Sequence, residues 1–294
     1  MNPQEYYRDN GYFVYRNLLP HDAIDNLLDL YNQKIIPAKY PFFRQDTNKY
    51  EPNQINKFGY VKQAFLDIHD YRDFPEFSTK AKDIFCSKLL QQALSQITGF
   101  TSFNLMQTML FDANTATSPH QDWWYLDSIS NGHLIAAWIA LEDIKAKAGR
   151  FYVIPKTIKV DLHSHMPNLP WLEWKKLMQQ YFDEHRSDVY APALNKGDVL
   201  FWNSRTIHGA LPTQDPSFSR KSLTAHYLPS NLKFGNLFTT KDYIKYKTYK
   251  GVNYYKNQPD YSPLNKLKSQ IKVAVYSKPR LLKAMRFIKT SFTT

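Results

Sequence analysis

The chain has 294 residues, of which 43% are hydrophobic and 16% aromatic, enough apolar surface to bury a substantial core. Its single cysteine, Cys86, excludes an internal disulfide, and the longest apolar run, Leu134–Leu141, is too short to cross a bilayer. No leader-like segment opens the sequence, so we expect a soluble cytoplasmic protein with Cys86 buried on a helix.

The positive charge is concentrated at the carboxyl end. Residues 231–294 hold 14 of the 38 Lys and Arg residues but only two of the 26 acidic residues, so the whole net charge of +12 lies there. The remaining chain is neutral and lacks the basic groove that nucleic acid requires. We therefore expect no nucleic-acid partner. We divide the chain into a domain at 1–235 and a basic, aromatic-rich extension at 236–294.

Two helices are predicted early in the chain. Residues 21–37 place Ile24, Leu27 and Tyr31 at helical spacing, with Asp22 as the residue that caps the helix. Residues 76–97 carry a similar apolar stripe and are predicted as one helix.

Short β-rich runs separated by turns follow at 103–112, 134–142, 151–154, 198–202 and 221–227. This order is not an alternation of strands and helices. It predicts a mainly β fold with flanking helices, a double-stranded β-helix or jelly roll of the cupin-like kind. Residues 155–195 form an insertion with a helix of its own beginning near Trp171. This insertion either covers a substrate site as a lid or packs on the outside of the barrel.

A His-x-Asp pair, His120 and Asp122, lies between the first two of these runs. On extended chain both side chains point to one face and Gln121 points away, because strand side chains alternate. With one distant histidine, such a pair can bind an octahedral metal on one face and leave the opposite positions open. His208, which follows a buried strand and precedes a glycine, is the candidate third ligand.

Arg220 opens a further alternating strand twelve residues after His208. A guanidinium group stays charged and can bind a carboxylate through two parallel hydrogen bonds. Since His226 lies an even number of residues from Arg220, we expect both on the inward face of this strand. His226 is then either a neighbour of a bound carboxylate ligand or a core histidine. His163 and His165 are interpreted as loop histidines.

Around these residues the chain resembles the phytanoyl-CoA dioxygenase-like family of Fe(II)/2-oxoglutarate oxygenases. The resemblance begins at Tyr7–Val14, which is similar to the family's opening strand, and runs to about residue 230. It implies that His120, Asp122 and His208 bind Fe(II), that Arg220 binds 2-oxoglutarate, and that O2 is the second cosubstrate. Segments similar to those that line the family's keto-acid pocket add further cosubstrate residues: Gln107, Met109, Trp138 and Lys62.

The chain departs from the family pattern after the distal histidine. The family often has a hydroxyl residue two places after it, and this chain has Ala210. The turn at Pro155–Ile158 also differs, and the spacing to Arg220 is about one residue longer. None of these departures affects the three metal ligands. Residues just after the His-x-Asp pair are expected to face the primary substrate: Trp124, Tyr125 and Asp127.

The resemblance implies a dioxygenase that acts on a small molecule. Asp122 fills the ligand position where halogenase relatives have a small residue, so hydroxylation is favoured over halogenation, with desaturation and ring closure left open. Two other classes use the same fold. One is a cupin-type metalloenzyme that does not need Arg220, and the other is a catalytically silent binding protein.

The end of the chain has the pattern of a basic amphipathic helix. After Pro279, where a helix can begin, Leu281, Met285, Ile288 and Phe292 fall on one side, and Lys and Arg residues occupy much of the other. Such a helix can lie on an anionic membrane or another polyanion, which would make the protein a peripheral membrane protein. The alternative is that its apolar side packs on the protein's own core.

Overall fold

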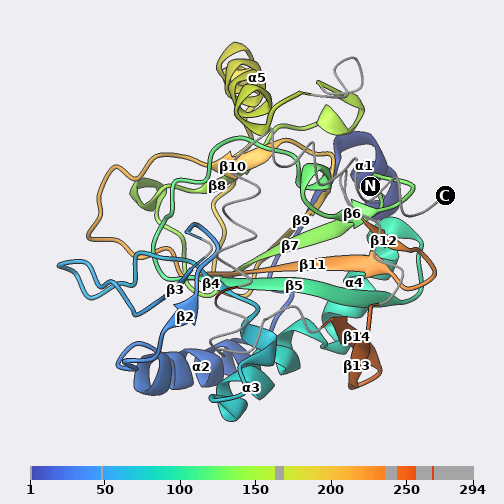
Figure 1. Ribbon diagram of the computed structural model, residues 1–294. Coiled ribbons are helices and arrows are strands. Elements are labelled where there is room, and N and C mark those ends of the chain that lie inside the picture. Colours follow the sequence, from blue (N-terminus) through green and yellow to red (C-terminus); the bar gives the residue numbers. More distant parts are fainter. Residues whose placement is uncertain (1, 48, 163–168, 236–243, 256–266, 268–294) are drawn as a thin grey trace.

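An eight-stranded sheet lies at the centre of the computed structural model, which describes residues 2–47, 49–162, 169–235, 244–255 and 267 (Figure 1). The strand order is β1-β9-β7-β11-β5-β14-β13, and β4 also pairs with β5. Neighbouring strands are antiparallel except β14 and β5. The strands are β1 (Tyr12–Tyr15), β9 (Val199–Asn203), β7 (Ile135–Ala140), β11 (Ser222–Pro229), β5 (Phe103–Phe111), β14 (Val252–Tyr255), β13 (Tyr246–Tyr249) and β4 (Phe65–Leu66).

A smaller second sheet lies over one face of the first. It pairs β10 (His208–Ala210) with β8 (Phe151–Val153) and is extended by single bridges from His120 to His208 and from Tyr190 to Val153. Two further strand pairs are β6 (Asp127–Ser128) with β12 (Phe234–Gly235) and β2 (Phe42–Phe43) with β3 (Tyr50–Glu51). The jelly roll predicted from the sequence is confirmed.

Helices cover the opposite face of the large sheet (Figure 1). They are α2 (His21–Leu30), α3 (Pro75–Phe85) and α4 (Lys88–Thr98), while α1 (Pro3–Asn10) precedes β1 and α5 (Trp171–Glu184) lies beyond the second sheet. Shorter helical turns occur at Tyr31–Ile35, Ile68–Asp70, Asp122–Trp124, Ala146–Ala148, Thr157–Lys159 and Arg186–Asp188. No helix in the described part of the chain is long and apolar enough to cross a membrane.

Side-chain alternation on β11 explains how the two layers are separated. Leu223, Ala225 and Tyr227 are fully buried in the core that the large sheet forms with α2, α3 and α4. The residues between them face the second sheet instead. A separate aromatic cluster fills the space between the two sheets and includes Trp138, Phe151 and Trp202. The face of β11 that carries His226 therefore looks into the interior of the jelly roll, and the side chain of Arg220, two residues before the strand, lies beside Trp138 of the same cluster.

The predicted helices differ from the observed ones in two places: one predicted helix is broken in its interior, and the residue predicted to cap the other does not do so. The single helix predicted over 76–97 is wrong, because the chain breaks at Cys86 and Ser87 and the Ser87 hydroxyl accepts a hydrogen bond from the Leu90 amide to start α4. The cap predicted at Asp22 is also wrong, since α2 begins after Pro20. Cys86 is buried, as predicted, but it lies in the break between α3 and α4 and not on a helix.

Parts of the 155–195 insertion and of the chain after residue 235 both pack against the jelly roll. Helix α5 of the 155–195 insertion buries Trp174 and Met178 against Tyr152 of the second sheet. Beyond residue 235, the hairpin β13–β14 joins the edge of the large sheet, with Asn253 paired to Asn104. The amphipathic segment at 278–292, like His163 and His165, lies outside the described residues.

Candidate metal centre

His120 and His208 are brought together by the backbone. Each donates its amide to the other's carbonyl at 3.0 Å. Gln121 is extended, with φ −118° and ψ 135°, and its side chain turns away to accept a hydrogen bond from the Trp123 indole at 2.7 Å. Asp122 then opens a short helical turn. The alternation predicted for the His-x-Asp pair is therefore confirmed, and Asp122 lies on the same side as both histidines.

The three side chains converge on one point. The Asp122 Oδ1 atom lies 3.6 Å from His120 Nε2 and 3.5 Å from His208 Nε2. The ligand atoms of all three residues lie within 4.8 Å of one another, and among the described residues this is the group of His, Cys, Asp and Glu side chains that could hold a metal ion. Asp122 and His208 are buried, and His120 is partly exposed.

Hydrogen bonds to the other side of each ring orient the ligands. The Nδ1 atoms of His120 and His208 lie 2.9 Å from the carbonyl oxygens of Ser118 and Thr206. Since a carbonyl only accepts, each Nδ1 carries the proton and each Nε2 presents a lone pair to the centre. The Trp202 indole donates to Asp122 Oδ2 at 2.9 Å, which leaves Oδ1 turned toward the histidines.

The ionisation of these groups suits a metal site. Burial lowers the pKa of His208 to about 3, so its imidazole is neutral at pH 7. Burial acts to raise the pKa of the Asp122 carboxyl group, but the nearby imidazoles of His208, His226 and His120 hold that pKa well below its usual range. Two imidazoles and one carboxylate, with their donor atoms on one side, form a donor set that fits an octahedral divalent ion with open positions.

Arg220 is a buried cation in the interior of the jelly roll, where the group formed by His120, Asp122 and His208 also lies. Its side chain is 2% exposed, its Nε has no hydrogen-bond partner, and among the described residues its guanidinium donates only a long 3.4 Å bond to the Gly149 carbonyl. The rings of Phe111 and Trp138 lie 5.6 and 5.9 Å from the guanidinium carbon. Burial lowers the pKa of Arg220 to about 10, so it remains charged at pH 7. A buried charge in this state is suited to an anionic ligand.

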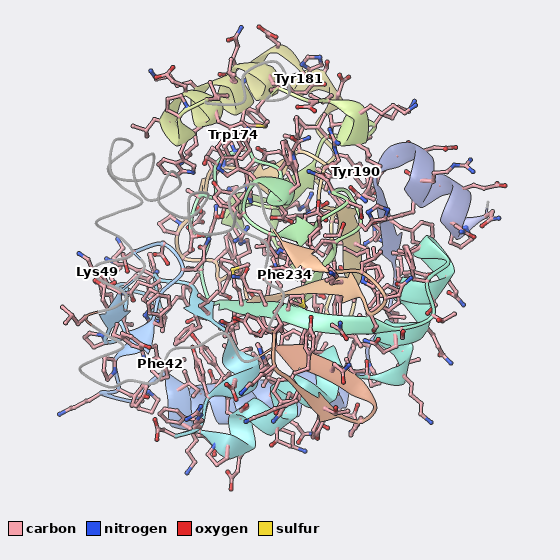
Figure 2. The ribbon with its side chains drawn as sticks, turned by 45° about the vertical axis from the view of Figure 1, so that its right-hand side comes forward. Phe42, Lys49, Trp174, Tyr181, Tyr190 and Phe234 are labelled. Atoms are coloured by element: carbon pink, nitrogen blue, oxygen red, sulfur yellow. The ribbon has the colours of Figure 1, made fainter. Side chains whose placement is uncertain are left out.

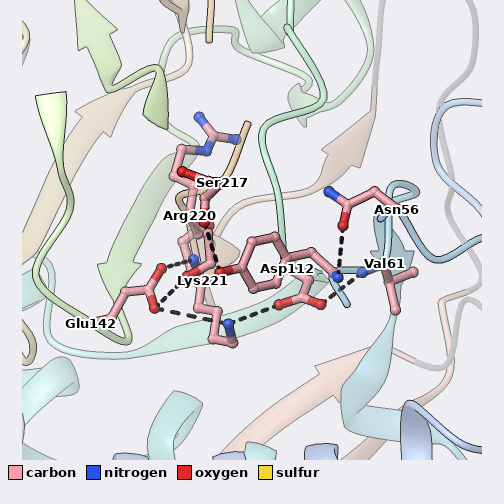
Figure 3. A network of polar contacts seen from close by, with 10 residues as sticks. Asn56, Val61, Asp112, Glu142, Ser217, Arg220 and Lys221 are labelled. Atoms are coloured by element: carbon pink, nitrogen blue, oxygen red, sulfur yellow. Dashed lines mark hydrogen bonds and ion pairs between the residues drawn. The ribbon is translucent and has the colours of Figure 1, made fainter. Parts of the chain in front are cut away.

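The backbone around Arg220 is held by a polar network on the other side of the strand (Figure 3). The Lys221 ammonium group lies 3.2 Å from Asp112 Oδ1 and 3.9 Å from Glu142 Oε2. The Asp112 carbonyl accepts the Arg220 amide at 2.9 Å, and its Oδ2 accepts the Val61 amide at 2.8 Å. Figure 3 shows the Arg220 guanidinium pointing away from this network, which fixes the chain at its base.

The other predicted cosubstrate residues lie around β11, except one. Met109 and Trp138 pair with Thr224 from the two sides, and Gln107 pairs with His226. Met109 and Trp138 are buried, and Gln107 is half-buried. Lys62 has an exposed side chain, and its described hydrogen bond runs from its backbone amide to the Gln54 carbonyl.

The three predicted substrate residues have different surroundings. Trp124 is buried and stacks on Trp174 of α5 with 4.5 Å between ring centroids; Figure 2 labels Trp174 beneath this helix. Tyr125 is 39% exposed, and its ring lies 6.0 Å from that of His120. The Asp127 carboxylate is buried and accepts hydrogen bonds from the chain itself, from the amides of Ser128, Gly132, His133 and Leu134 and the hydroxyl of Ser204.

Two side chains at the centre were not assigned a role from the sequence. Trp202 lies in an apolar strand, where nothing in the local pattern distinguishes it from a core residue. His226 has its Nε2 atom 3.4 Å from Asp122 Oδ2. The even spacing from Arg220 predicted the inward direction of His226 correctly, although it left open whether the residue belongs to the core or to the site.

Comparison with known sequences relates the chain to one family. The family model described as phytanoyl-CoA dioxygenase matches residues 7–222. The human peroxisomal phytanoyl-CoA dioxygenase is 25% identical over 253 residues, covering 80% of this chain and 70% of the human protein. The corresponding Bos taurus protein is 24% identical over 253 residues, with the same coverage.

Solved structures share the fold at low sequence identity. The α-ketoglutarate-dependent epimerase SnoN from nogalamycin biosynthesis superposes with a TM-score of 0.57 at 15% identity, covering 86% of this chain and 96% of that one. EctD from S. alaskensis, solved with 2-oxoglutarate and 5-hydroxyectoine, gives 0.54 at 14% identity, covering 79% and 77%. HygX from Streptomyces hygroscopicus, solved with nickel, 2-oxoglutarate and hygromycin B, gives 0.52 at 13% identity, covering 79% and 88%.

Proposed function

Because this chain belongs to the phytanoyl-CoA dioxygenase family, we propose that it hydroxylates a small molecule with Fe(II) bound by His120, Asp122 and His208. The protein is a non-haem dioxygenase that depends on Fe(II) and 2-oxoglutarate, with O2 as the second cosubstrate. The observation that carries the proposed site is that two imidazoles and a carboxylate, of which Asp122 and His208 are buried and His120 is partly exposed, share one interior with a buried arginine that has no acidic partner among the described residues.

Arg220 binds the far carboxylate of 2-oxoglutarate in this proposal. Its guanidinium group can donate two parallel hydrogen bonds to that carboxylate and neutralise its charge away from water. Gln107, Met109 and Trp138 line the same cosubstrate pocket, and the apolar side chains among them exclude water from the keto acid. Lys62 takes part only if its exposed side chain folds inward when the keto acid binds.

The iron and the keto acid together supply the oxidising chemistry, in which O2 is reduced, CO2 and succinate are released, and one oxygen atom is inserted into the substrate. The protein's own residues have three tasks. His120, Asp122 and His208 leave one side of the metal open, Arg220 orients the keto acid, and the aromatic cluster around Trp138 keeps the interior dry. Since Asp122 provides a carboxylate ligand, chloride has no vacant ligand position there, which favours hydroxylation over halogenation.

The primary substrate enters beside Tyr125 in this proposal. Tyr125 is the exposed member of the three predicted substrate residues and lies against His120. The hydroxyl of Tyr125 accepts a hydrogen bond from the Trp171 indole at 3.0 Å, so the first turn of α5 borders the same opening. The 155–195 insertion then serves as a substrate cover. Trp124 and Asp127 are buried and support this opening from the interior of the protein.

Turnover of 2-oxoglutarate tests the function. The full chain is incubated with Fe(II), 2-oxoglutarate and air, and succinate and CO2 are measured. Fe(II)-dependent succinate formation is the expected result. A protein that binds metal but leaves 2-oxoglutarate intact would be a cupin-type metalloenzyme, and one that binds neither would be a silent binding protein.

Localisation is proposed as cytoplasmic, with peripheral contact to an anionic membrane or polyanion through the basic extension. The support is the concentration of the net charge of +12 in residues 231–294.

A further inference from the structure

His226 is a buried histidine at the metal centre whose ring nitrogens both lack a hydrogen bond within the described residues. The residue is 2% exposed and lies on β11, in register with Gln107 and Ala136 of the neighbouring strands. Leaving both nitrogens of a buried imidazole unpaired is costly, so a group in this state requires an explanation. The explanation must lie in what surrounds the ring.

The outer oxygen of the carboxylate of Asp122 lies close to this ring. His226 Nε2 lies 3.4 Å from Asp122 Oδ2 without the alignment of a hydrogen bond. The same oxygen accepts the Trp202 indole hydrogen at 2.9 Å, and the Trp202 ring stands edge-on to the His226 ring at 6.1 Å. Two potential donors therefore converge on Oδ2.

The inner oxygen of Asp122 has different surroundings. Oδ1 faces the Nε2 atoms of His120 and His208, at 3.6 and 3.5 Å. The carboxylate thus presents one oxygen to the metal position and the other to the protein. Small rotations of the Asp122 side chain would exchange a one-oxygen contact with the metal for a two-oxygen contact, unless something holds Oδ2 back.

The number of Asp122 oxygen atoms bound to the metal decides whether a coordination position is left for dioxygen. In an octahedral ion, two imidazoles and one carboxylate oxygen occupy one face, a keto acid takes two of the open positions, and one position remains for dioxygen. If Asp122 bound through both oxygens, the carboxylate would take that last position. The site then needs a device that keeps Oδ2 off the metal.

We propose that His226 is a positioning residue that donates its Nε2 hydrogen to Asp122 Oδ2 in the metal-loaded protein. Together with Trp202 it holds Oδ2 away from the metal, so that Asp122 binds through Oδ1 alone. This role rests on the proposed function, because it assumes that His120, Asp122 and His208 hold the metal. The hydrogen bond gives the Nε2 atom of His226 a partner when the ion draws the carboxylate into place.

The direct test is a crystal structure of the full chain with Mn(II), which stands in for Fe(II), and 2-oxoglutarate. The expected result is a His226 Nε2 to Asp122 Oδ2 distance of about 2.9 Å, with only Oδ1 on the metal. A metal bound by both oxygens of Asp122, or a His226 ring bonded to the keto acid instead, would overturn the proposal.

Variants test the consequence in solution. His226→Phe keeps a ring of similar size and removes the donor, and His226→Gln keeps an N–H group. In His226→Phe, the rate of O2-dependent 2-oxoglutarate consumption should fall about tenfold or more, while the dissociation constant for 2-oxoglutarate stays near that of the wild type. His226→Gln should recover part of the rate. Absorption spectra of the Co(II) forms should differ between wild type and His226→Phe, since they report the number of ligands on the metal.

Tyr227→Phe is the matched control. Tyr227 is the next residue of β11, faces the opposite core and donates to the Phe85 carbonyl, so the substitution perturbs the strand without touching the site. It should retain the wild-type rate and Co(II) spectrum. If wild type neither binds Mn(II) nor consumes 2-oxoglutarate, the proposed function itself fails. If wild type does both and His226→Phe matches it, only the role of His226 is refuted.

Discussion

His120 and His208 exchange two backbone hydrogen bonds of 3.0 Å, so the main chain itself sets the separation of two proposed metal ligands. The ring planes follow from this, because each Nδ1 is tied to a carbonyl two residues earlier in the chain. The proposed metal centre is therefore preformed by sheet geometry, and its side chains can be replaced without removing the backbone hydrogen bonds that hold the two segments together.

Replacing any one of the three ligands by alanine should abolish iron-dependent turnover and leave the fold intact. Asp122→Ala removes the carboxylate and leaves two imidazoles, which hold a divalent ion too weakly for catalysis. Succinate formation and metal content after dialysis measure the loss, and far-UV circular dichroism verifies the fold. Near-normal 2-oxoglutarate decarboxylation by Asp122→Ala would show that the ligand assignment is wrong.

Arg220→Lys should weaken 2-oxoglutarate binding with little effect on metal affinity. Lysine keeps the charge but cannot make two parallel hydrogen bonds, at a cost of about 1–3 kcal/mol, which raises the 2-oxoglutarate requirement roughly 5- to 150-fold. Calorimetric titration of the Mn(II) form with 2-oxoglutarate measures this change. An unchanged 2-oxoglutarate affinity would point to a cupin-type site that does not use the keto acid.

Trp174→Ala should detach α5 from the second sheet. Trp174 is fully buried and stacks on Trp124, so its loss should cost about 3–5 kcal/mol of unfolding free energy. Urea denaturation measures the cost, and Leu172→Ala, at a position that is 63% exposed, is the control expected to change stability by less than about 0.5 kcal/mol. Equal effects of the two substitutions would contradict the packing of this helix.

His69 should make the protein less stable in mild acid. Burial lowers the pKa of His69 to about 4, below its ordinary value of 6.5, so the unfolded chain binds a proton more readily than the folded one between these values. The stabilisation is complete above pH 6.5 and is lost as the pH falls toward 4, by about 3 kcal/mol. Urea denaturation at pH 7.5 and 5.0 measures the part of this loss that falls above pH 5.0, about 2 kcal/mol. His69→Gln should lose less stability over this interval than wild type does, and an equal loss would assign the effect to other groups.

The basic extension should bind anionic vesicles if its amphipathic pattern serves as a membrane contact. Sedimentation with vesicles containing phosphatidylserine compares the full chain with one that ends at Ser277. Only the full chain is expected to sediment, and less of it at high salt, because each basic residue near the surface contributes about 1 kcal/mol of screened attraction. Equal sedimentation of both chains, or none of either, would exclude this role for residues 278–294.

Local sequence pattern was sufficient wherever one segment determines its own geometry. Alternation on extended chain predicted that His120 and Asp122 share a face and that Gln121 turns away, and the same alternation placed His226 on the inward side of β11. It also located the main strands, because apolar runs between turns specify where a strand lies. The break between α3 and α4 was missed, since a continuous apolar stripe outweighed the capping preference of Ser87.

Tertiary structure alone decided which distant side chains meet. Nothing near Trp202 in the sequence indicates that its indole donates to Asp122, and nothing near Asp127 indicates that its carboxylate accepts bonds from Leu134 and Ser204. Periodicity fixes the face on which a residue lies but not the strand that lies beside it, because pairing between distant segments depends on the packing of the whole core. The proposed metal ligands are therefore readable from the sequence, while the side chains that orient them are defined only when the sheets assemble.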